Sequence, residues 1–254
     1  MLKLNMLNFK SLLRKASIDY LIPSLNITFT NDGWVVAKSI STDNNSISIL
    51  KIKNDILNIK KKEELVFNFA DIAFNLKPYI NLIKDEDVNI KIDDDKITIK
   101  DDKKRKFNLF FCTKEFTNHF SGDDPSSKFK FFYDNDVNFM DQFNEIKPIA
   151  LKFNKIYFTC AENKLYLEAT DKTNAFCNNV NMEIDELTEN FDNEVSMCFD
   201  FRNFSSIIST IEERIDNFKI KIVYLEEESA GMIIFENKSE NEKYFITSRN
   251  ENLE

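Results

Sequence analysis

The chain has 254 residues, of which 43% are hydrophobic and 13% aromatic, and its net charge is −9. This composition supports one large or two ordinary domains, and only three glycines and four prolines argue against a disordered or loop-rich protein. The acidic balance speaks against general affinity for nucleic acid without excluding a local basic face, and no apolar run approaches the roughly 20 residues of a membrane helix.

The first half is predicted to contain two helices and several strands. The first helix covers residues 5–17 and places its cations on the side opposite its apolar residues. The second helix covers residues 70–81, and Pro78 lies near its end, where we expect a kink or an early stop. Strands are predicted at residues 25–30, 34–39, 47–53, 64–68, 88–92, 96–100 and 106–113.

A polar stretch at residues 117–127, which contains Gly122 and Pro125, is predicted to be a linker. After it the order of elements repeats. Helices are predicted at residues 137–146 and 201–213. Strands are predicted at residues 151–159, 164–169, 174–182, 194–199, 218–225, 232–237 and 243–247.

Matching segments recur about 130 residues apart in the same order. Residues 27–30 return as 156–159, residues 67–69 return as 199–201, and the alternating run 88–92 returns as 218–222. A period this long predicts a duplicated domain rather than a solenoid repeat. We therefore expect one domain at residues 1–117, a connecting loop at 118–132 and a second domain at 133–254.

Motifs for catalysis or metal binding are missing from the sequence. His119 is the single histidine, which excludes a histidine-based triad or metal cage within one chain. No phosphate-binding loop of the G-x-x-x-x-G-K-[ST] form occurs. The four cysteines lack paired metal spacing and, without a signal peptide, are expected to be reduced thiols in a cytoplasm-like compartment: Cys112, Cys160, Cys177 and Cys198. We predict a non-enzymatic protein without cofactor or bound metal.

Three local stretches carry a resemblance to a known family. They are Ser46-Ile47-Ser48-Ile49, the run from Phe199 to Phe204, and Tyr244-Phe245-Ile246-Thr247 followed by Arg249. With the order and lengths of the elements, they resemble the two-domain sliding clamps of the PCNA type, found in archaea, eukaryotes and some phages. The final strand departs from the family because the usual proline is absent.

The resemblance implies an α+β fold of two similar domains, each an antiparallel sheet with two helices. Chains of this family join head to tail as a homotrimer whose helices line a hole for DNA. The implied function is a DNA sliding clamp, a ring-shaped processivity factor that encircles duplex DNA and tethers the replicative DNA polymerase. A separate clamp loader would place it on DNA. We expect it in the cytoplasm or nucleoid of a prokaryote or phage system, or in a eukaryotic nucleus.

A protein that slides on duplex DNA is expected to contact phosphates rather than base edges. Long cations dispersed on the helices suit this task, although a solvated helix face explains any one of them. The candidates are Lys10, Arg14, Lys15, Lys77, Lys147, Arg202 and Arg214. Asp141, Glu145, Glu212 and Glu213 dilute the positive field in the second domain, so we expect weak, salt-sensitive contact.

Ring closure requires two exposed strand edges. One candidate is the closing strand of the first domain, with Phe107, Leu109, Phe110 and Phe111. The other is the strand at residues 174–182, with Phe176 and Val180. Strand alternation also permits Phe107, Leu109 and Phe111 to face the core.

The resemblance further implies an apolar pocket for partner peptides beneath the connecting loop. The matching positions are Ile40, Ile47, Ile49, Phe129, Phe131, Phe132, Tyr244, Phe245 and Ile246. Some of them are expected to be core residues, with Ile47 or Ile49 first. The phenylalanines after the linker are stronger candidates, because three of them cannot all face one side of a strand.

Other functions stay open at this point. The chain could serve as one subunit of a heterotrimeric checkpoint-type clamp, or as a non-catalytic scaffold. A metal-dependent nuclease built on Asp93–Asp95 with Asp101 and Asp102 is a further alternative, although a charged turn without EF-hand spacing is the simpler interpretation. A binding module unrelated to DNA is the last alternative.

Overall fold

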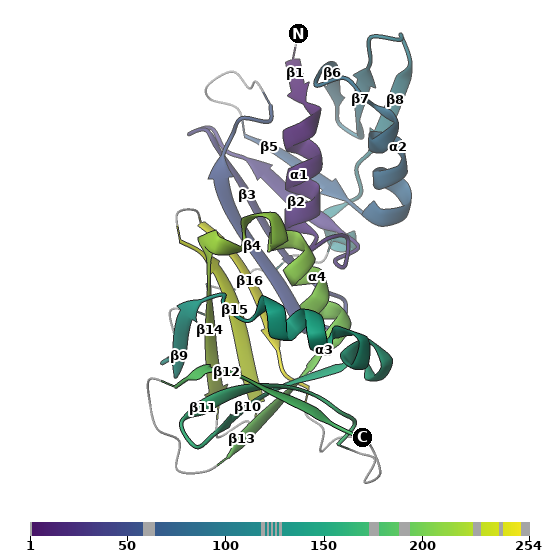
Figure 1. Ribbon diagram of the computed structural model, residues 1–254. Coiled ribbons are helices and arrows are strands. Elements are labelled where there is room, and N and C mark those ends of the chain that lie inside the picture. Colours follow the sequence, from purple (N-terminus) through teal and green to yellow (C-terminus); the bar gives the residue numbers. More distant parts are fainter. Residues whose placement is uncertain are drawn as a thin grey trace. The chain divides into compact units, whose positions relative to one another are not determined.

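The computed structural model describes residues 2–57, 64–117, 120, 122, 124, 126, 129–172, 178–187, 194–225, 230–238 and 241–249. They form two compact units (Figure 1). The first is Met1–Asp123 with Glu240–Glu242, and the second is Asp124–Ser239 with Lys243–Glu254. The loop boundaries expected at residues 118 and 132 stay a prediction.

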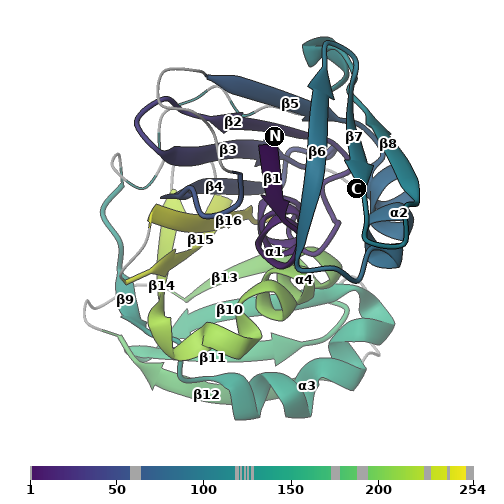
Figure 2. The ribbon, with the colours of Figure 1, turned by 90° about the horizontal axis from the view of Figure 1, so that it is seen from above.

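The first unit contains two antiparallel ladders of four strands each. One has the order β1-β6-β7-β8, formed by β1 (Leu2–Asn5), β6 (Asp87–Asp93), β7 (Lys96–Lys100) and β8 (Lys106–Phe110). The other has the order β5-β2-β3-β4, formed by β2 (Leu25–Phe29), β3 (Trp34–Ile40), β4 (Ser46–Lys53) and β5 (Leu65–Phe69). In Figure 2 the strands β1, β6, β7 and β8 run side by side.

Helix α1 (Met6–Ala16) begins at Asn5, whose side-chain oxygen accepts a hydrogen bond of 2.9 Å from the amide of Asn8. Its apolar residues recur every three or four positions, so one face is buried. A short π-helical turn (Ile72–Leu76) precedes α2 (Lys77–Leu82). The expected kink at Pro78 is wrong, because Pro78 lies in the first turn of α2, where a missing amide proton costs no helical hydrogen bond.

The second unit has the same construction. One ladder has the order β9-β14-β15-β16, formed by β9 (Tyr133–Asp136), β14 (Phe218–Leu225), β15 (Ala230–Asn237) and β16 (Asn241–Thr247). The other has the order β13-β10-β11-β12, formed by β10 (Lys155–Ala161), β11 (Lys164–Ala169), β12 (Val180–Glu186) and β13 (Val195–Asp200).

The helices of this unit are α3 (Met140–Phe153) and α4 (Phe201–Ile211), and a 3-10 segment (Glu212–Asn217) follows α4. Helix α3 continues through Pro148 and ends at Asn154, which adopts a left-handed φ of 53°. The strand expected from residue 151 therefore begins at Lys155 instead. The short strands β1 and β9 were not predicted from the sequence.

The strand orders show the duplication directly. Each strand of the first unit has a counterpart eight strands later, and the two ladders of one unit match those of the other strand for strand. The recurring sequence segments lie in counterpart strands, namely β2 with β10, the end of β5 with the end of β13, and β6 with β14. The prediction of an α+β fold with two similar domains, antiparallel sheet and two helices each, is confirmed.

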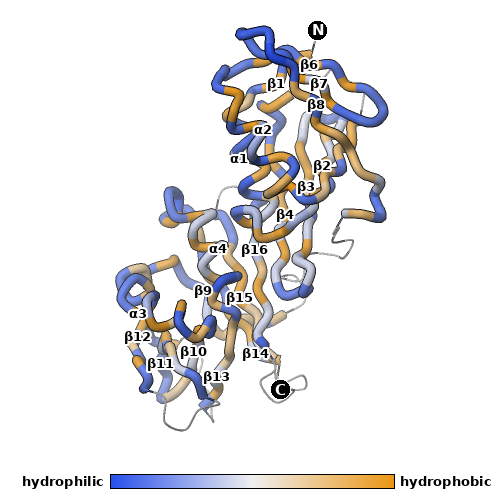
Figure 3. Tube along the Cα trace, turned by 90° about the vertical axis from the view of Figure 1, so that its right-hand side faces the viewer, coloured by the Kyte–Doolittle hydropathy of each residue, from blue (hydrophilic) through white to orange (hydrophobic). Residues whose placement is uncertain are grey.

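Phenylalanine rings fill both cores. In the first unit Phe67 lies 5.1 Å from Phe29 and 6.2 Å from Phe69 between ring centroids. In the second unit Phe204 lies 5.5 Å from Phe158 and 5.7 Å from Phe143. Figure 3 shows the hydrophobic colour concentrated on strands and helices, while the turns that end the strands are hydrophilic. Such ring pairs contribute about 0.5–1.5 kcal/mol each beyond the burial of their area.

Candidate nucleic-acid interface and partner surfaces

Lys10 and Arg14 lie one helical turn apart on α1. The Nζ atom of Lys10 donates a hydrogen bond of 2.8 Å to the carbonyl oxygen of Ile83, the residue that ends α2. Burial, and then the positive charge of Lys84, lower the pKa of Lys10. Lys10 therefore joins the two helices and neutralises the carboxyl end of α2.

Arg14 belongs to a second group of charged residues on the helix layer of the first unit, by which we mean α1, the π-helical turn and α2. Its Nε atom lies 3.7 Å from a carboxylate oxygen of Asp19. Lys77 places Nζ 3.9 Å from the centroid of the Tyr20 ring, a cation–π contact. Ile18, Asp19 and Tyr20, in the segment that carries this ring, all have left-handed φ angles between 51° and 69°.

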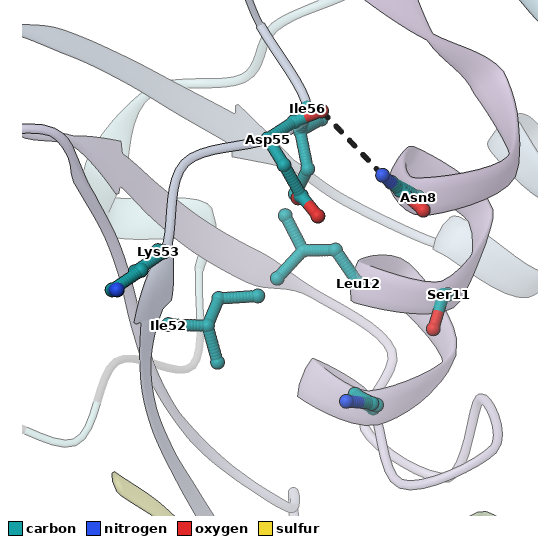
Figure 4. A pocket seen from close by; sticks show the side chains of 8 residues that line it. Asn8, Ser11, Leu12, Ile52, Lys53, Asp55 and Ile56 are labelled. Atoms are coloured by element: carbon teal, nitrogen blue, oxygen red, sulfur yellow. Dashed lines mark hydrogen bonds between the residues drawn. The ribbon is translucent and has the colours of Figure 1, made fainter. Parts of the chain in front are cut away.

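Lys15 forms an ion pair of 3.3 Å with Glu242, whose side chain is fully buried and which groups with the first unit. Lys15 also lines a hollow of about 190 Å³ between α1 and the end of β4 (Figure 4). On the helix side of this hollow the side-chain amide of Asn8 donates a hydrogen bond of 3.5 Å to the backbone carbonyl of Asp55. The cation of Lys15 is thus held by a specific partner.

The predicted cations of the second unit have different surroundings. Lys147 on α3 and Arg202 on α4 are exposed, and the Nζ atom of Lys147 lies 5.8 Å from the centroid of the Phe143 ring. Arg214 lies in the 3-10 segment, half-buried, with its guanidinium 5.5 Å from the Phe218 ring. The acidic side chains expected to dilute the field are exposed on the same elements: Asp141, Glu145, Glu212 and Glu213.

Exposed apolar side chains on the first unit's helix layer were missed from the sequence. Leu7 is 66% exposed, Phe74 81%, Tyr79 52% and Leu82 54%. They belong to α1, the π-helical turn and α2. The sequence could have indicated this exposure. A helix over residues 70–81 has more apolar side chains than one buried face can hold, so some of them must be exposed. This layer therefore carries cations and apolar surface together.

Strands β8 and β12 are the terminal strands of their ladders within the described residues. On β8, Leu109 is buried, and Phe111 beyond its end stacks 5.2 Å from Phe67. Leu109 and Phe111 thus face the core of the unit, as strand alternation permitted. Phe107 is half-buried, and Phe110 is 62% exposed. On β12, Val180 is half-buried, and Phe176 lies outside the described residues.

The two terminal strands differ in charge. Four exposed cations lead into β8: Lys103, Lys104, Arg105 and Lys106. Three acidic side chains occupy the end of β12: Glu183, Asp185 and Glu186. Asp185 accepts hydrogen bonds from the Tyr133 hydroxyl at 2.7 Å and from Asn135 at 2.8 Å. Burial alone would raise the pKa of Asp185, but these hydrogen bonds outweigh it and lower the pKa.

In the first unit the residues predicted for a partner pocket share one face of the β3–β4 pair. Ile40 lies directly opposite Ile47, and Ile49 lies opposite Lys38. Ile47 is 8% exposed, while Ile40 and Ile49 are half-buried. Two residues of the connecting segment contact β3 here, because Lys38 donates to the Gly122 carbonyl at 3.4 Å and accepts from the Phe120 amide at 3.3 Å.

In the second unit the predicted positions divide into core and surface. Tyr244, Phe245 and Ile246 are at most 1% exposed and are core residues in this structure rather than walls of an open pocket. Phe132 is also buried, whereas Phe129 and Phe131 are half-buried. Strand alternation would expose Phe245 between its two neighbours, but the structure buries all three side chains.

Ion pairs hold this connecting segment. Lys243 of β16 lies 2.8 Å from Asp124 and 2.7 Å from Glu236, and it donates to Ser126 at 2.9 Å. Farther along, Lys221 places Nζ 5.6 Å from the Phe131 ring. Burial alone would raise the pKa values of Asp124 and Glu236, but hydrogen bonds from lysine outweigh it and lower both.

Three of the five carboxylates considered for a nuclease, Asp93, Asp95 and Asp101, pair with cations. Asp93 pairs with Lys91, and Asp101 accepts a hydrogen bond of 2.6 Å from Arg105 within its own turn. Within the described ranges no group of three or more His, Cys, Asp or Glu side chains is placed to hold a metal ion. Cys112 and Cys160 are free thiols, and burial raises the pKa of Cys160 to about 12. None of the helices in the described part of the chain is long and apolar enough to cross a membrane.

No protein-family model matches the sequence, and no curated protein matches it. Solved structures do match. PCNA from Thermococcus kodakaraensis has a TM-score of 0.65 at 12% identity, over 98% of this chain and 100% of that one. A. fulgidus PCNA, bound to the C-terminal region of FEN-1, has a TM-score of 0.64 at 14% identity, over 99% of each chain.

The β chain of DNA polymerase III from Streptococcus pneumoniae matches with a TM-score of 0.67 at 12% identity. The match covers 98% of this chain but only 64% of that one. Since all these identities are below 16%, the comparisons establish the fold, which is that of the DNA clamps.

Proposed function

We propose that this chain is the subunit of a DNA sliding clamp, a homotrimeric ring that encircles duplex DNA and tethers the replicative DNA polymerase. The observation that carries the proposal is the duplicated clamp fold, which matches two PCNA chains over nearly their whole length. In this role the chain is a non-enzymatic scaffold.

Ring closure is assigned to β8 and β12, the terminal strands of their ladders in the described residues. An antiparallel pairing of β8 from one copy with β12 from the next satisfies both free edges. That direction places the basic start of β8 beside the acidic end of β12, so the charges favour one orientation. The contact is head to tail and closes into a ring when the rotation allows.

Contact with DNA is assigned to the helix layers. Lys10, Lys15 and Lys77 are held by partners within the first unit, while Lys147 and Arg202 are exposed in the second. Few cations are therefore available for phosphates, and weak binding that falls steeply with salt is expected. Retention then depends on encirclement, and a separate clamp loader opens the ring.

Partner capture is assigned to the outer sheet faces beside the connecting segment. Ile40 and Ile49 offer half-buried apolar surface in the first unit, and Phe129 and Phe131 do so in the second. A polymerase peptide with apolar anchors fits such surfaces. Tyr244, Phe245 and Ile246 are left out of this assignment because they are buried.

Retention on circular DNA tests the proposal. Protein loaded on a nicked circular plasmid by the cognate loader is expected to stay bound in high salt and to leave when the plasmid is cut once. A protein that binds through surface contacts alone would instead dissociate in high salt from both forms, and this result would contradict the clamp function.

A further inference from the structure

One face of the β1-β6-β7-β8 ladder carries five lysines. The strand register places Lys3, Asn89, Lys100 and Lys106 in one row across the four strands. Lys91, Thr98 and Asn108 form the next row, and Asp93, Lys96 and Phe110 form the third. We call this surface the lysine face. Asp87 and Asp93 are its two acidic residues, so its charge is positive on a chain whose net charge is −9.

The lysines of this face are only partly neutralised by neighbours. Lys91 pairs with Asp93, and Lys96 pairs with Asp95 at 3.0 Å. Lys100 and Lys106 lie directly opposite each other on β7 and β8, and neither has an ion pair within the described residues. Like charges directly opposite on paired strands are destabilising, so a bound anion would relieve this pair.

The lysine face is also hollowed. A depression of about 470 Å³ is lined by Asn89, Lys91, Lys96, Lys100 and Lys106 among others. Thr98 is buried at its floor and donates a hydrogen bond of 3.1 Å to Asn108. At the edge the Phe110 ring is 62% exposed, with Lys96 Nζ 5.7 Å from its centroid.

From this arrangement we propose that the lysine face binds single-stranded nucleic acid. Alternate residues along a strand lie about 6.6 Å apart and neighbouring strands about 4.8 Å, so the cations form a grid that can track a flexible phosphate chain. The exposed Phe110 ring can stack only on a base that is unpaired, and such stacking tolerates any sequence. Asn89 and Asn108 add amide donors and acceptors beside it. An acidic peptide would use the lysines and leave the ring without a role.

The site does not include the helix cations, but Lys106 also lies at the basic start of β8, which is assigned to ring closure. The variants are therefore compared on the purified chain at concentrations low enough to give a single-chain mass. The readout is fluorescence anisotropy of a labelled oligothymidylate of about 20 nucleotides, titrated at several salt concentrations. The variant Lys100→Gln with Lys106→Gln is expected to weaken binding on the order of tenfold at low salt, and to reduce the slope of log affinity against log salt by about 1.4. The control Lys51→Gln with Lys114→Gln has the same charge change on exposed residues elsewhere in the unit and should leave both values unchanged.

The variants are expected to fold, so a loss of binding would not be due to unfolding. Removing the opposed lysines is expected to keep or raise the melting temperature, because a repulsive pair is lost. Lys3→Gln, on the terminal strand β1, provides a second variant and should reduce the salt slope by about 0.7. Unchanged affinity and slope in both variants, or an equal loss in the control, would overturn the proposal. Equal affinity for a duplex of the same length would overturn the single-strand assignment, and competition by polyglutamate at equal charge would assign the face to an acidic protein instead.

Discussion

The two units share one strand order but differ in how their helix layers carry charge. In the first unit Lys10, Lys15 and Lys77 are each held by a partner, and exposed apolar side chains such as Phe74 lie on the same layer. In the second unit Lys147 and Arg202 are exposed among acidic neighbours. The duplication therefore conserved topology, which depends on buried alternation and helix caps, while the surface chemistry diverged.

The largest effect is expected in the aromatic core of the second unit. Phe204 contacts the rings of Phe139, Phe143, Phe158 and Phe235 and is fully buried. Phe204→Ala should lower the free energy of unfolding by about 3–5 kcal/mol in urea titrations. The exposed Leu151→Ala is the control and should stay within about 0.5 kcal/mol. A loss below about 1 kcal/mol would mean that this cluster does not support the unit.

The second effect concerns the oppositely charged edges of the two units. Lys103→Glu with Lys104→Glu should weaken self-association at least about tenfold, and Glu183→Lys with Glu186→Lys should do the same, since each places like charges across the joint. Combining all four changes should restore association, as measured by sedimentation equilibrium. Failure of the combined variant to recover would exclude this antiparallel orientation.

The ion pairs that hold the connecting segment should be pH-dependent. Asp124 and Glu236 have folded pKa values below their ordinary values of 3.8 and 4.5, so the unfolded chain binds protons more readily than the folded one. Their contribution is therefore complete above about pH 5 and is lost as the pH falls through and below about 4. Lys243→Met should cost about 1–2 kcal/mol at neutral pH. That difference in unfolding free energy should shrink below pH 4; a constant difference would show that the carboxylates are not its source.

A smaller difference in stability is expected between variants of the helix cations in the two units. Lys10→Met removes a charge-assisted hydrogen bond to the end of α2 and should cost about 1 kcal/mol of stability. Lys147→Met, on the exposed face of α3, should change stability by less than about 0.5 kcal/mol. Chemical denaturation of both variants measures the two costs, and equal costs would remove the distinction between the hydrogen-bonded Lys10 and the exposed Lys147.

The smallest effect lies in counterpart hairpin turns. The β2–β3 turn has Gly33 at a φ of 86°, whereas the β10–β11 turn has Glu162 and Asn163 at 52° and 63°. Since glycine adopts positive φ without strain, Asn163→Gly should raise stability by about 0.5–1 kcal/mol, and Gly33→Ala should lower it by about 1 kcal/mol. Thermal melts of both variants should shift in opposite directions. A downward shift for Asn163→Gly would mean that the asparagine side chain contributes more than the glycine relieves.

The duplication and most strands could be predicted because alternation is a local signal. The predictions that failed concern where helices begin and end. The third helix was expected to end at residue 146, yet Ile146 and Ala150 are both buried and α3 continues through Pro148 to Phe153. Pro78 suggested a late kink, yet a π-helical turn moved the start of α2 to the proline.

The surfaces could be predicted less well, because they depend on contacts between distant segments. The sequence indicated that Lys10 and Lys15 lie on one side of α1, but it could not show that Ile83 and Glu242 would hold them. The burial of Phe245 likewise depends on what covers its face of the sheet. The row of Lys100 and Lys106 follows from the register of β7 and β8, which composition alone does not reveal.

The solution mass of the purified chain, measured by light scattering during gel filtration, tests the ring most directly. The account predicts a species of about three times the chain mass of 29.9 kDa at physiological salt, shifting to one chain when the salt is high enough to screen the charged edges. A single-chain mass at every concentration and at low salt would contradict a homotrimeric clamp.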